Sequence, residues 1–146
     1  MSKTECTVRV LRPEEAGVLD NVAPDVFDND IDPRWTAEFF ADPRHHIAVA
    51  LDGGQVVGFA SGVRYVHPDK PPELFINEVG VAPTHQGRGL ARRLMHALMD
   101  HGRGLGCTQA WVGTEHDNVA ANRLYASVGG VREDFVLYAF RLVPEE

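Results

Sequence analysis

Apolar and polar residues alternate in several short segments of the chain, and this alternation predicts β-strands. Val8 and Val10 alternate with polar neighbours until Pro13 ends the first segment. The turn Asp52-Gly53-Gly54 separates two apolar runs and is typical of a hairpin, so those runs are expected to pair antiparallel. The expected strands are residues 7–10, 46–51, 55–63, 73–81, 110–114 and 135–142.

Helical periodicity is clearest from Leu90 to Leu105, where apolar residues recur at intervals of three and four. Gly104 and Gly106 are expected to end that helix. Pro13 followed by two glutamates is a favourable helix start, because proline fits the first turn and acidic groups oppose the helix dipole. The expected helices are one that begins at Pro13 and those over residues 33–41, 90–105 and 119–128.

The order of these elements, β-α-α-β-β-β-α-β-α-β, predicts a mixed α/β (α+β) fold. A strand-helix-strand unit over residues 79–114 implies a right-handed parallel connection, whereas the hairpin implies antiparallel pairing. We therefore expect a mixed, twisted sheet with helices on both faces. No internal repeat, low-complexity tract or linker interrupts the pattern, so residues 1–146 are expected to form one domain.

Composition excludes several classes of function. The chain is 44% hydrophobic and 24% charged, which is ordinary for a globular protein, and it has neither a long apolar run nor a signal-peptide pattern. We expect a cytoplasmic protein with no membrane partner. The net charge of −7 argues against a nucleic-acid partner and suits a cationic substrate. Cys6 and Cys107 are expected to be free thiols, and no Cys or His spacing predicts a metal.

The segment 86–91, Gln-Gly-Arg-Gly-Leu-Ala, lies between an expected strand and the longest expected helix. Gly87 and Gly89 allow a sharp turn and a close approach to a ligand. The first N–H groups of a helix have no intrahelical partner, and its dipole attracts anions, so this turn predicts a pyrophosphate site. Three cations, Arg88, Arg92 and Arg93, add positive charge to the same place in an acidic chain.

This turn resembles the acetyl-CoA signature of the GNAT N-acetyltransferase superfamily, Q/R-x-x-G-x-G/A after a β-strand, here preceded by Val-Gly-Val-Ala-Pro at 79–83. A second segment is similar to the family pattern N-x-x-A-x-x-L-Y-x-x-x-G, and its matching residues are Asn118, Ala121, Leu124, Tyr125 and Gly129. Gly130 departs from the family, in which an aromatic residue usually follows. The resemblance implies a sheet of six to seven strands with about four helices, and acetyl-CoA as cosubstrate.

The resemblance also implies roles for individual residues. The backbone of Val79 and Val81 would pair with the pantetheine arm of the coenzyme, and Asn118 would contact that arm or position the amine. Tyr125 would face the sulfur and act as general acid. The residues implied to hold the pyrophosphate are Gln86, Gly87, Arg88, Gly89, Leu90, Ala91 and Arg92.

An amine must be neutral to attack a thioester, and at pH 7 only about one alkylamine in 10³ is neutral. A general base is therefore useful. Glu78 is our candidate, because strand alternation directs it away from Val79 and beside Gly80, where a missing side chain would leave room for substrate. His116, in the loop 115–117, and a chain of water molecules are alternative bases; the loop itself is also a natural place for a helix cap.

The acceptor is expected to be a small polycationic amine. An acidic segment lies between the first two expected helices and would attract such a molecule; its candidate substrate-binding residues are Asp28, Asp30 and Asp32, together with Trp35 and Glu78. Residues 25–27, 50–58 and 77–79 also resemble aminoglycoside 3-N-acetyltransferases of type I. A peptide or protein N-acetyltransferase and a non-catalytic acyl-CoA-binding module remain alternatives, and a homodimer is a further possibility.

Overall fold

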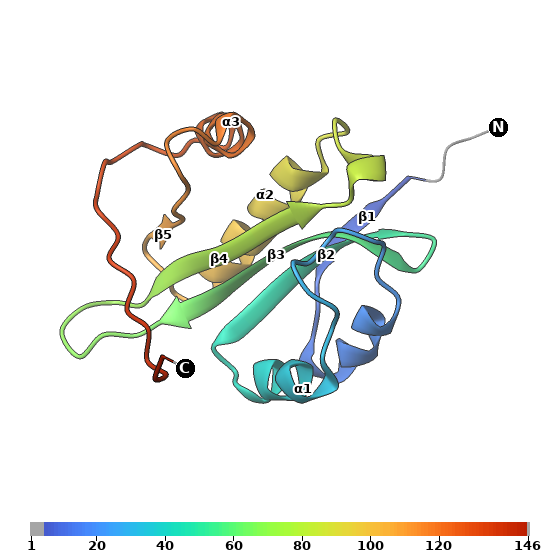
Figure 1. Cartoon of the computed structure of the whole chain (residues 1–146), viewed down its shortest axis with the longest axis horizontal. Coiled ribbons are helices and arrows are strands. Elements are labelled where there is room, and N and C mark those ends of the chain that lie inside the picture. Colours follow the sequence, from blue (N-terminus) through green and yellow to red (C-terminus); the bar gives the residue numbers. More distant parts are fainter. Residues whose placement is uncertain (1–4, 146) are drawn as a thin grey trace.

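The computed structural model describes residues 5–145 and contains a five-stranded sheet with helices on both sides (Figure 1). The strands are β1 (Thr7–Val10), β2 (His45–Asp52), β3 (Gln55–Tyr65), β4 (Glu73–Val81) and β5 (Ala110–Trp111). The α-helices are α1 (Pro33–Ala41), α2 (Leu90–Gly104) and α3 (Val119–Ser127), and the 3-10 helices are η1 (Pro13–Asp20) and η2 (Pro83–His85).

The strands follow one another across the sheet in chain order, β1-β2-β3-β4-β5. The first four are antiparallel neighbours, whereas β5 runs parallel to β4. Gly53 and Gly54 form the predicted hairpin turn with φ of 58° and 89°, values that glycine adopts without strain. The mixed sheet predicted from the sequence is confirmed.

The core includes the layer between the sheet and α2 and, on the other side, buried residues of η1 and the segment after it, Leu19, Ala23 and Val26. The predicted periodicity of α2 is confirmed, because Leu94 and Leu98 are completely buried against the sheet. Gly102 continues the same face and allows Leu74 to approach so closely that an added Cβ would lie 2.9 Å from a Leu74 methyl group. On the other side of the sheet η1 and α1 lie together next to β2 and β3 (Figure 1). Helix α2 is therefore packed on the sheet along its buried face, from Leu90 in its first turn to Gly102 in its last.

Three predictions about individual elements need correction. Residues 135–142 form no strand among the described residues, and their side chains are exposed, so the sheet has five strands rather than six or seven. The helix that begins at Pro13 is a 3-10 helix with a kink at Glu15. The strand expected over 110–114 contains only Ala110 and Trp111, because only these two residues pair with β4.

The two cysteines, Cys6 and Cys107, are free and half-buried. Within residues 5–145, we find no helix that combines the length and the apolar character needed to cross a lipid bilayer.

Candidate functional site

Strands β4 and β5 part after two residue pairs. Only Leu74 and Phe75 pair with Ala110 and Trp111, and the remainder of β4 has no neighbouring strand on that side within residues 5–145. Backbone N–H and C=O groups at a sheet edge bind an extended ligand readily, because they can pair with it as with another strand. The open edge of β4 is therefore a ready-made binding surface.

A β-bulge in β4 decides which backbone groups face this open edge. Ser61 of β3 lies opposite Glu78, but the next residue of β3, Gly62, lies opposite Ile76, so Asn77 is an extra residue. An extra residue shifts the alternation of the strand by one position.

The direction of the backbone on either side of Asn77 confirms the shift. The N–H of Leu74 donates to a carbonyl oxygen just before β5 (2.8 Å), whereas the N–H of Ala82 donates to a carbonyl oxygen of β3 (2.8 Å). Regular alternation would direct both residues to the same side. Because Ala82 points to β3, the backbone groups of Val79 and Val81 point to the open edge.

The turn after β4 continues this surface to the start of α2. Gly87 and Gly89 have φ of 77° and 76°, in the left-handed region that other residues rarely adopt. The N–H of Arg93 is the first in α2 to bond within the helix, to the Gly89 carbonyl (3.2 Å), so the preceding amides are available to a ligand. The turn encloses a shallow pocket of about 130 Å³, lined by Val81, His85, Gln86, Gly87, Gly89, Leu90, Ala91 and Arg92.

Side chains hold the turn in place from within. The Gln86 side-chain amide donates to the Val81 carbonyl (3.1 Å), and Arg88 donates to the Thr84 carbonyl (3.3 Å). Arg88 and Arg92 are exposed at the turn, whereas Arg93 reaches away from it and donates to the backbone carbonyl of Cys6. Of the three expected cations, Arg92 therefore lines the pocket, Arg88 lies exposed in the turn, and Arg93 fastens α2 to the residue before β1.

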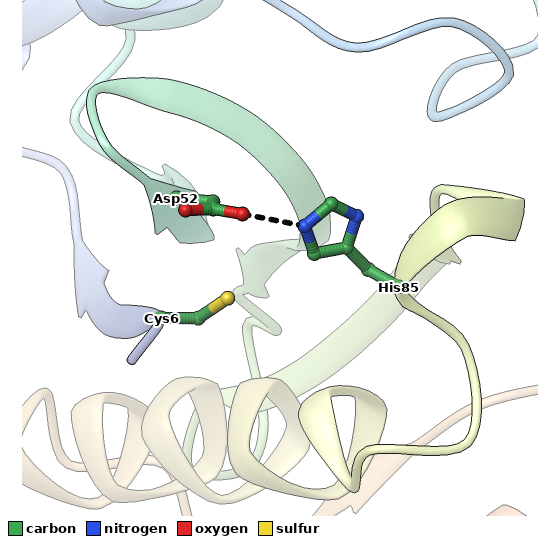
Figure 2. Close-up of side chains that lie close together, drawn as sticks. All are labelled: Cys6, Asp52 and His85. Carbon is green, nitrogen blue, oxygen red and sulfur yellow. Dashed lines mark hydrogen bonds and ion pairs between the residues drawn. The ribbon is translucent and has the colours of Figure 1, made fainter. Parts of the chain in front are cut away.

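Figure 2 shows a further anchor, in which His85 of η2 points to Asp52 at the end of β2, with Cys6 beside them. Three potential metal-ligand atoms of these residues lie within 4.8 Å of one another. However, His85 Nε2 and an Asp52 carboxylate oxygen are 2.7 Å apart, a hydrogen-bond distance, whereas two ligands of one tetrahedral zinc are about 3.4 Å apart. The hydrogen bond between His85 and Asp52 therefore ties the turn to the β2–β3 hairpin.

Helix α3 packs against α2 and carries Asn118 and Tyr125. The Asn118 side-chain oxygen accepts a hydrogen bond from the N–H of Ala121 (3.0 Å), so Asn118 is the helix cap. Its side-chain NH₂ group is left for other contacts. Tyr125 is half-buried against the core, and this burial raises the pKa of its phenol. A tyrosine phenol is protonated at neutral pH and can donate a proton, although a raised pKa makes it a weaker acid than an exposed tyrosine.

Glu78 lies on the same face of β4 as Gly80, and that face is turned toward Val26 and not toward α2. Burial, and to a smaller extent the carboxylate of Asp28, raise the pKa of Glu78. Neighbouring Gly80 does not leave room for a substrate, contrary to our expectation. A Cβ at Gly80 would lie 2.6 Å from the carbonyl oxygen of Val26, so the segment after η1 already fills that space.

The acidic segment before α1 contains groups of two kinds. Asp28 and Asp30 are exposed, and Asp28 lies close enough to Glu78 to affect its pKa. Asp32 instead caps α1, accepting from the N–H of Arg34 (2.8 Å) and pairing with the Arg34 guanidinium (3.2 Å). That guanidinium also lies over the exposed ring of Trp35, 5.4 Å from its centre. Asp32 is therefore committed to local structure.

His116, the alternative base, is exposed in a small ionic cluster. Its Nδ1 contacts the Arg132 guanidinium, and its Nε2 lies 3.7 Å from the Asp134 carboxylate. The sequence analysis did not predict the contact between His46 of β2 and His101 of α2, in which His46 Nδ1 and His101 Nε2 are 2.9 Å apart. Both residues lie far apart in the sequence, so no local spacing could have revealed the contact.

The family model described as the acetyltransferase (GNAT) family matches residues 16–129, more than three quarters of the chain. This chain belongs to the GNAT family. The match includes β4, the turn, α2 and α3, the elements that build the candidate site.

The curated relatives of this chain include acetyltransferases with different names. The N-alpha-acetyltransferase RimI of Mycobacterium tuberculosis is 42% identical over 89 residues, covering 61% of this chain and 54% of the relative. The L-2,4-diaminobutyric acid acetyltransferase of Streptomyces coelicolor is 40% identical over 95 residues, covering 64% of this chain and 52% of the relative. The chain thus spans about half the length of the curated relatives it matches.

Among solved GNAT structures, AAC(6')-Iy in complex with the bisubstrate analogue CoA-S-monomethyl-acetylneamine matches with a TM-score of 0.77. Sequence identity is 19%, and the match covers 94% of this chain and 99% of the other. At that identity the likeness establishes the GNAT fold.

Proposed function

We propose that the protein transfers an acetyl group from acetyl-CoA to a primary amine. The observation that carries the proposal is the continuous surface made by the open edge of β4 and the turn at the start of α2. The backbone of Val79 and Val81 faces that edge and would pair with the pantetheine arm of coenzyme A. The free amides of residues 90–92, with Arg88 and Arg92 beside them, would bind the pyrophosphate. AAC(6')-Iy, which shares the fold, was solved with a coenzyme A conjugate.

The transfer would proceed by direct attack in a ternary complex. The amine nitrogen attacks the thioester carbonyl carbon, the carbon–sulfur bond breaks, and the coenzyme leaves as a thiol. Tyr125 is the proposed donor of the proton to the departing sulfur, because its phenol is protonated at neutral pH and it occupies the tyrosine position of the family pattern. Asn118 would position the pantetheine or the amine through its free side-chain NH₂ group.

Glu78 is the proposed base, acting on the amine directly or through water. Its raised pKa makes it a stronger proton acceptor than an ordinary carboxylate. Asp28 contributes to the raised pKa of Glu78. The same carboxylate would therefore strengthen the base and favour a positively charged substrate. Arg132 and Asp134 already occupy the ring of His116, which makes it the weaker candidate.

The proposed acceptor is a small molecule with more than one amino group. The carboxylate of Asp28 lies close enough to Glu78 to raise its pKa, and Asp30 is exposed two residues further along the same segment. Exposed Trp35 lies on the helix that follows this segment. Coulomb attraction would favour a multiply charged amine there. An aminoglycoside suits this chemistry, as does a diamino acid such as the substrate named for the Streptomyces relative. The RimI relative favours a second candidate, the N-terminal amine of a protein.

Acetyl-CoA-dependent release of free thiol, followed with an amine panel, tests the proposal. The panel contains an aminoglycoside, 2,4-diaminobutyrate and a short peptide with a free N-terminus. Turnover of the diamines supports the small-acceptor assignment, whereas turnover of the peptide alone supports the second candidate. Coenzyme A binding without turnover of any amine identifies a non-catalytic module, and failure to bind coenzyme A refutes the proposal.

Variants assign the two proposed roles. Tyr125→Phe should lower kcat about 10²-fold or more, the usual contribution of a proton donor, and leave coenzyme A affinity unchanged. Tyr65→Phe, at an exposed tyrosine of β3, is the control. Asp28→Asn should move the acidic limb of the pH–rate profile to lower pH, because the Asp28 carboxylate raises the pKa of Glu78. An unchanged limb would remove Glu78 as the base; Glu38→Gln, on the exposed side of α1, controls for loss of negative charge.

A further inference from the structure

Three side chains from separate parts of the chain meet beside the turn that leads to α2. Cys6 precedes β1, Asp52 ends β2, and His85 ends η2. Figure 2 shows the Cys6 sulfur directed toward the pair formed by Asp52 and His85. One potential ligand atom from each residue lies within 4.8 Å of the other two, and all three residues are half-buried. Because the three residues are far apart in the sequence, no local spacing could have predicted this cluster.

The donor atoms of the cluster suit a borderline-soft divalent cation. Thiolate and imidazole are ligands that zinc prefers, whereas magnesium and calcium prefer oxygen ligands alone. The thiolate and the carboxylate together carry two negative charges, so with a neutral imidazole they balance the charge of one Zn²⁺ ion. The side chains of His85 and Asp52 are 13% and 32% exposed, so an ion can reach them from solvent. Water would take the fourth tetrahedral position.

The second ring nitrogen of His85 already has a partner that orients the ring for coordination. Nδ1 lies 2.8 Å from the Thr84 hydroxyl oxygen, and Nε2 lies 2.7 Å from an Asp52 carboxylate oxygen. When the proton is on Nδ1, it is donated to Thr84 and the lone pair of Nε2 is left for a metal. Metal-binding histidines are oriented in this way in many proteins.

The proton balance of zinc binding follows from these contacts. The His85 proton moves from Nε2 to Nδ1, so the imidazole stays neutral. The S–H bond of Cys6 breaks, a sulfur–zinc bond forms, and the thiol proton is released to solvent. Binding of one Zn²⁺ ion therefore releases about one proton.

Small side-chain movements would convert the hydrogen-bonded pair into two metal ligands. The distance between His85 Nε2 and the Asp52 oxygen must increase from 2.7 Å to about 3.4 Å. A rotation of about 30° about one side-chain bond moves a terminal atom by about 1 Å and stays within a rotamer well. The backbone at Cys6 is held in place, because its carbonyl accepts a hydrogen bond from Arg93 (3.1 Å).

We propose that Cys6, Asp52 and His85 bind one zinc ion. The ion joins three segments, namely the residue before β1, the β2–β3 hairpin and the turn that leads to α2, whereas the hydrogen bond joins only the last two. His85 also lines the pocket at that turn, so the zinc ion supports the wall of the pocket from behind. Its role is structural, and the proposal does not depend on the acetyl transfer proposed above.

Calorimetric titration of the reduced, full-length chain with ZnCl₂ tests the site, with a protein that carries no histidine tag. We expect one zinc ion per chain and no binding of Mg²⁺ at the same concentration. At a zinc concentration about 100 times the dissociation constant, Tm should rise by about 5 °C or more. Absence of zinc binding up to about 100 μM overturns the proposal, as does Mg²⁺ binding of equal strength.

Cobalt(II) identifies the sulfur ligand, because coordination by a thiolate gives this ion a charge-transfer absorption in the near ultraviolet. Cys6→Ser should abolish the absorption and raise the zinc dissociation constant at least about 100-fold. Cys107→Ser, at the other half-buried cysteine, is the matched control and should keep the absorption and the zinc affinity. Absorption that persists in Cys6→Ser, or that disappears in Cys107→Ser, overturns the proposal.

Asp52→Asn tests the site without changing the cysteine. The asparagine oxygen can still accept a hydrogen bond from His85, so the turn stays tied to the hairpin. The variant lacks the negative charge that balances the ion, and its zinc dissociation constant should rise at least about 10-fold. Unchanged zinc affinity in Asp52→Asn would rule out the proposed ligand set.

Discussion

The pair formed by His46 and His101 should make the stability of the fold depend on pH in the mildly acidic range. His46 Nδ1 is bonded to His101, and its Nε2 is buried without a hydrogen-bond partner among residues 5–145. Protonation would give His46 a second N–H with no acceptor in a poorly solvated place. Burial first, and then the positive charges of His101, His45 and Arg64, lower the pKa of His46 to about 4 from its ordinary value of 6.5.

The sign follows from this direction. Between pH 6.5 and 4 the unfolded chain binds a proton at His46 that the folded chain does not, so the free energy of unfolding falls as the pH falls. A pKa of 4 rather than 6.5 corresponds to a loss of about 2 kcal/mol between pH 7 and pH 5. Because His46 is only half-buried, solvent screening reduces this to about 1 kcal/mol. For a chain of this length, that is a drop in Tm of about 3 °C.

Urea unfolding at pH 7 and pH 5 measures the effect. His46→Gln retains an amide that can bond to His101 but cannot titrate, so the variant should lose less stability at pH 5 than the wild type by about 1 kcal/mol. Burial also lowers the pKa of His101, so part of the pH dependence should remain. His96→Gln, which removes an exposed histidine from α2, the helix of His101, is the control. Its stability should depend on pH as that of the wild type does. A His46→Gln variant that loses as much stability as the wild type would refute the reasoning.

Two glycines give sharper tests of local geometry. Gly80→Ala should lower the free energy of unfolding by about 1–3 kcal/mol, because its Cβ would overlap the Val26 carbonyl, whereas Gly104→Ala, with open space around it, should be neutral or slightly stabilising. Equal stability of the two variants in urea would contradict this. Gly89→Ala should weaken coenzyme A binding in calorimetry about 10-fold or more, because it strains the left-handed residue that aims the amides. Gly106→Ala is the control, because it introduces the same kind of backbone strain at the other end of α2, away from the turn. If Gly106→Ala lost as much affinity for coenzyme A as Gly89→Ala, the turn would not be the cause of the loss.

Local sequence patterns predicted most of the elements, because their causes are local. The hairpin follows from two glycines that accept positive φ, and α2 follows from an apolar spacing that one buried face requires. Residues 135–142 show where this reasoning ends. They have the pattern of a strand, but a strand exists only with a partner, and the sequence does not say which edge receives it.

The candidate site was predictable to a lesser extent. The sequence placed the turn at residues 86–91 correctly, because glycine spacing and the start of α2 are read directly from it. It could not show that the Val26 carbonyl fills the space beside Gly80 or that Arg93 bonds to the backbone before β1, because tertiary packing brings these residues together. Nor could it show that Asp32 accepts a hydrogen bond from Arg34, because Asp32 could equally have faced a substrate. The roles of Glu78 and Tyr125 stay predictions.

The extra residue in β4 has a consequence for evolution and for protein engineering. Asn77 divides one strand into two stretches of opposite orientation, one that fixes the strand in the sheet and one that presents Val79 and Val81 to a ligand. Loss or gain of a single codon between them would turn the ligand-facing amides inward, even if every side chain were conserved. Single-residue insertions and deletions should therefore be far rarer in this strand than substitutions.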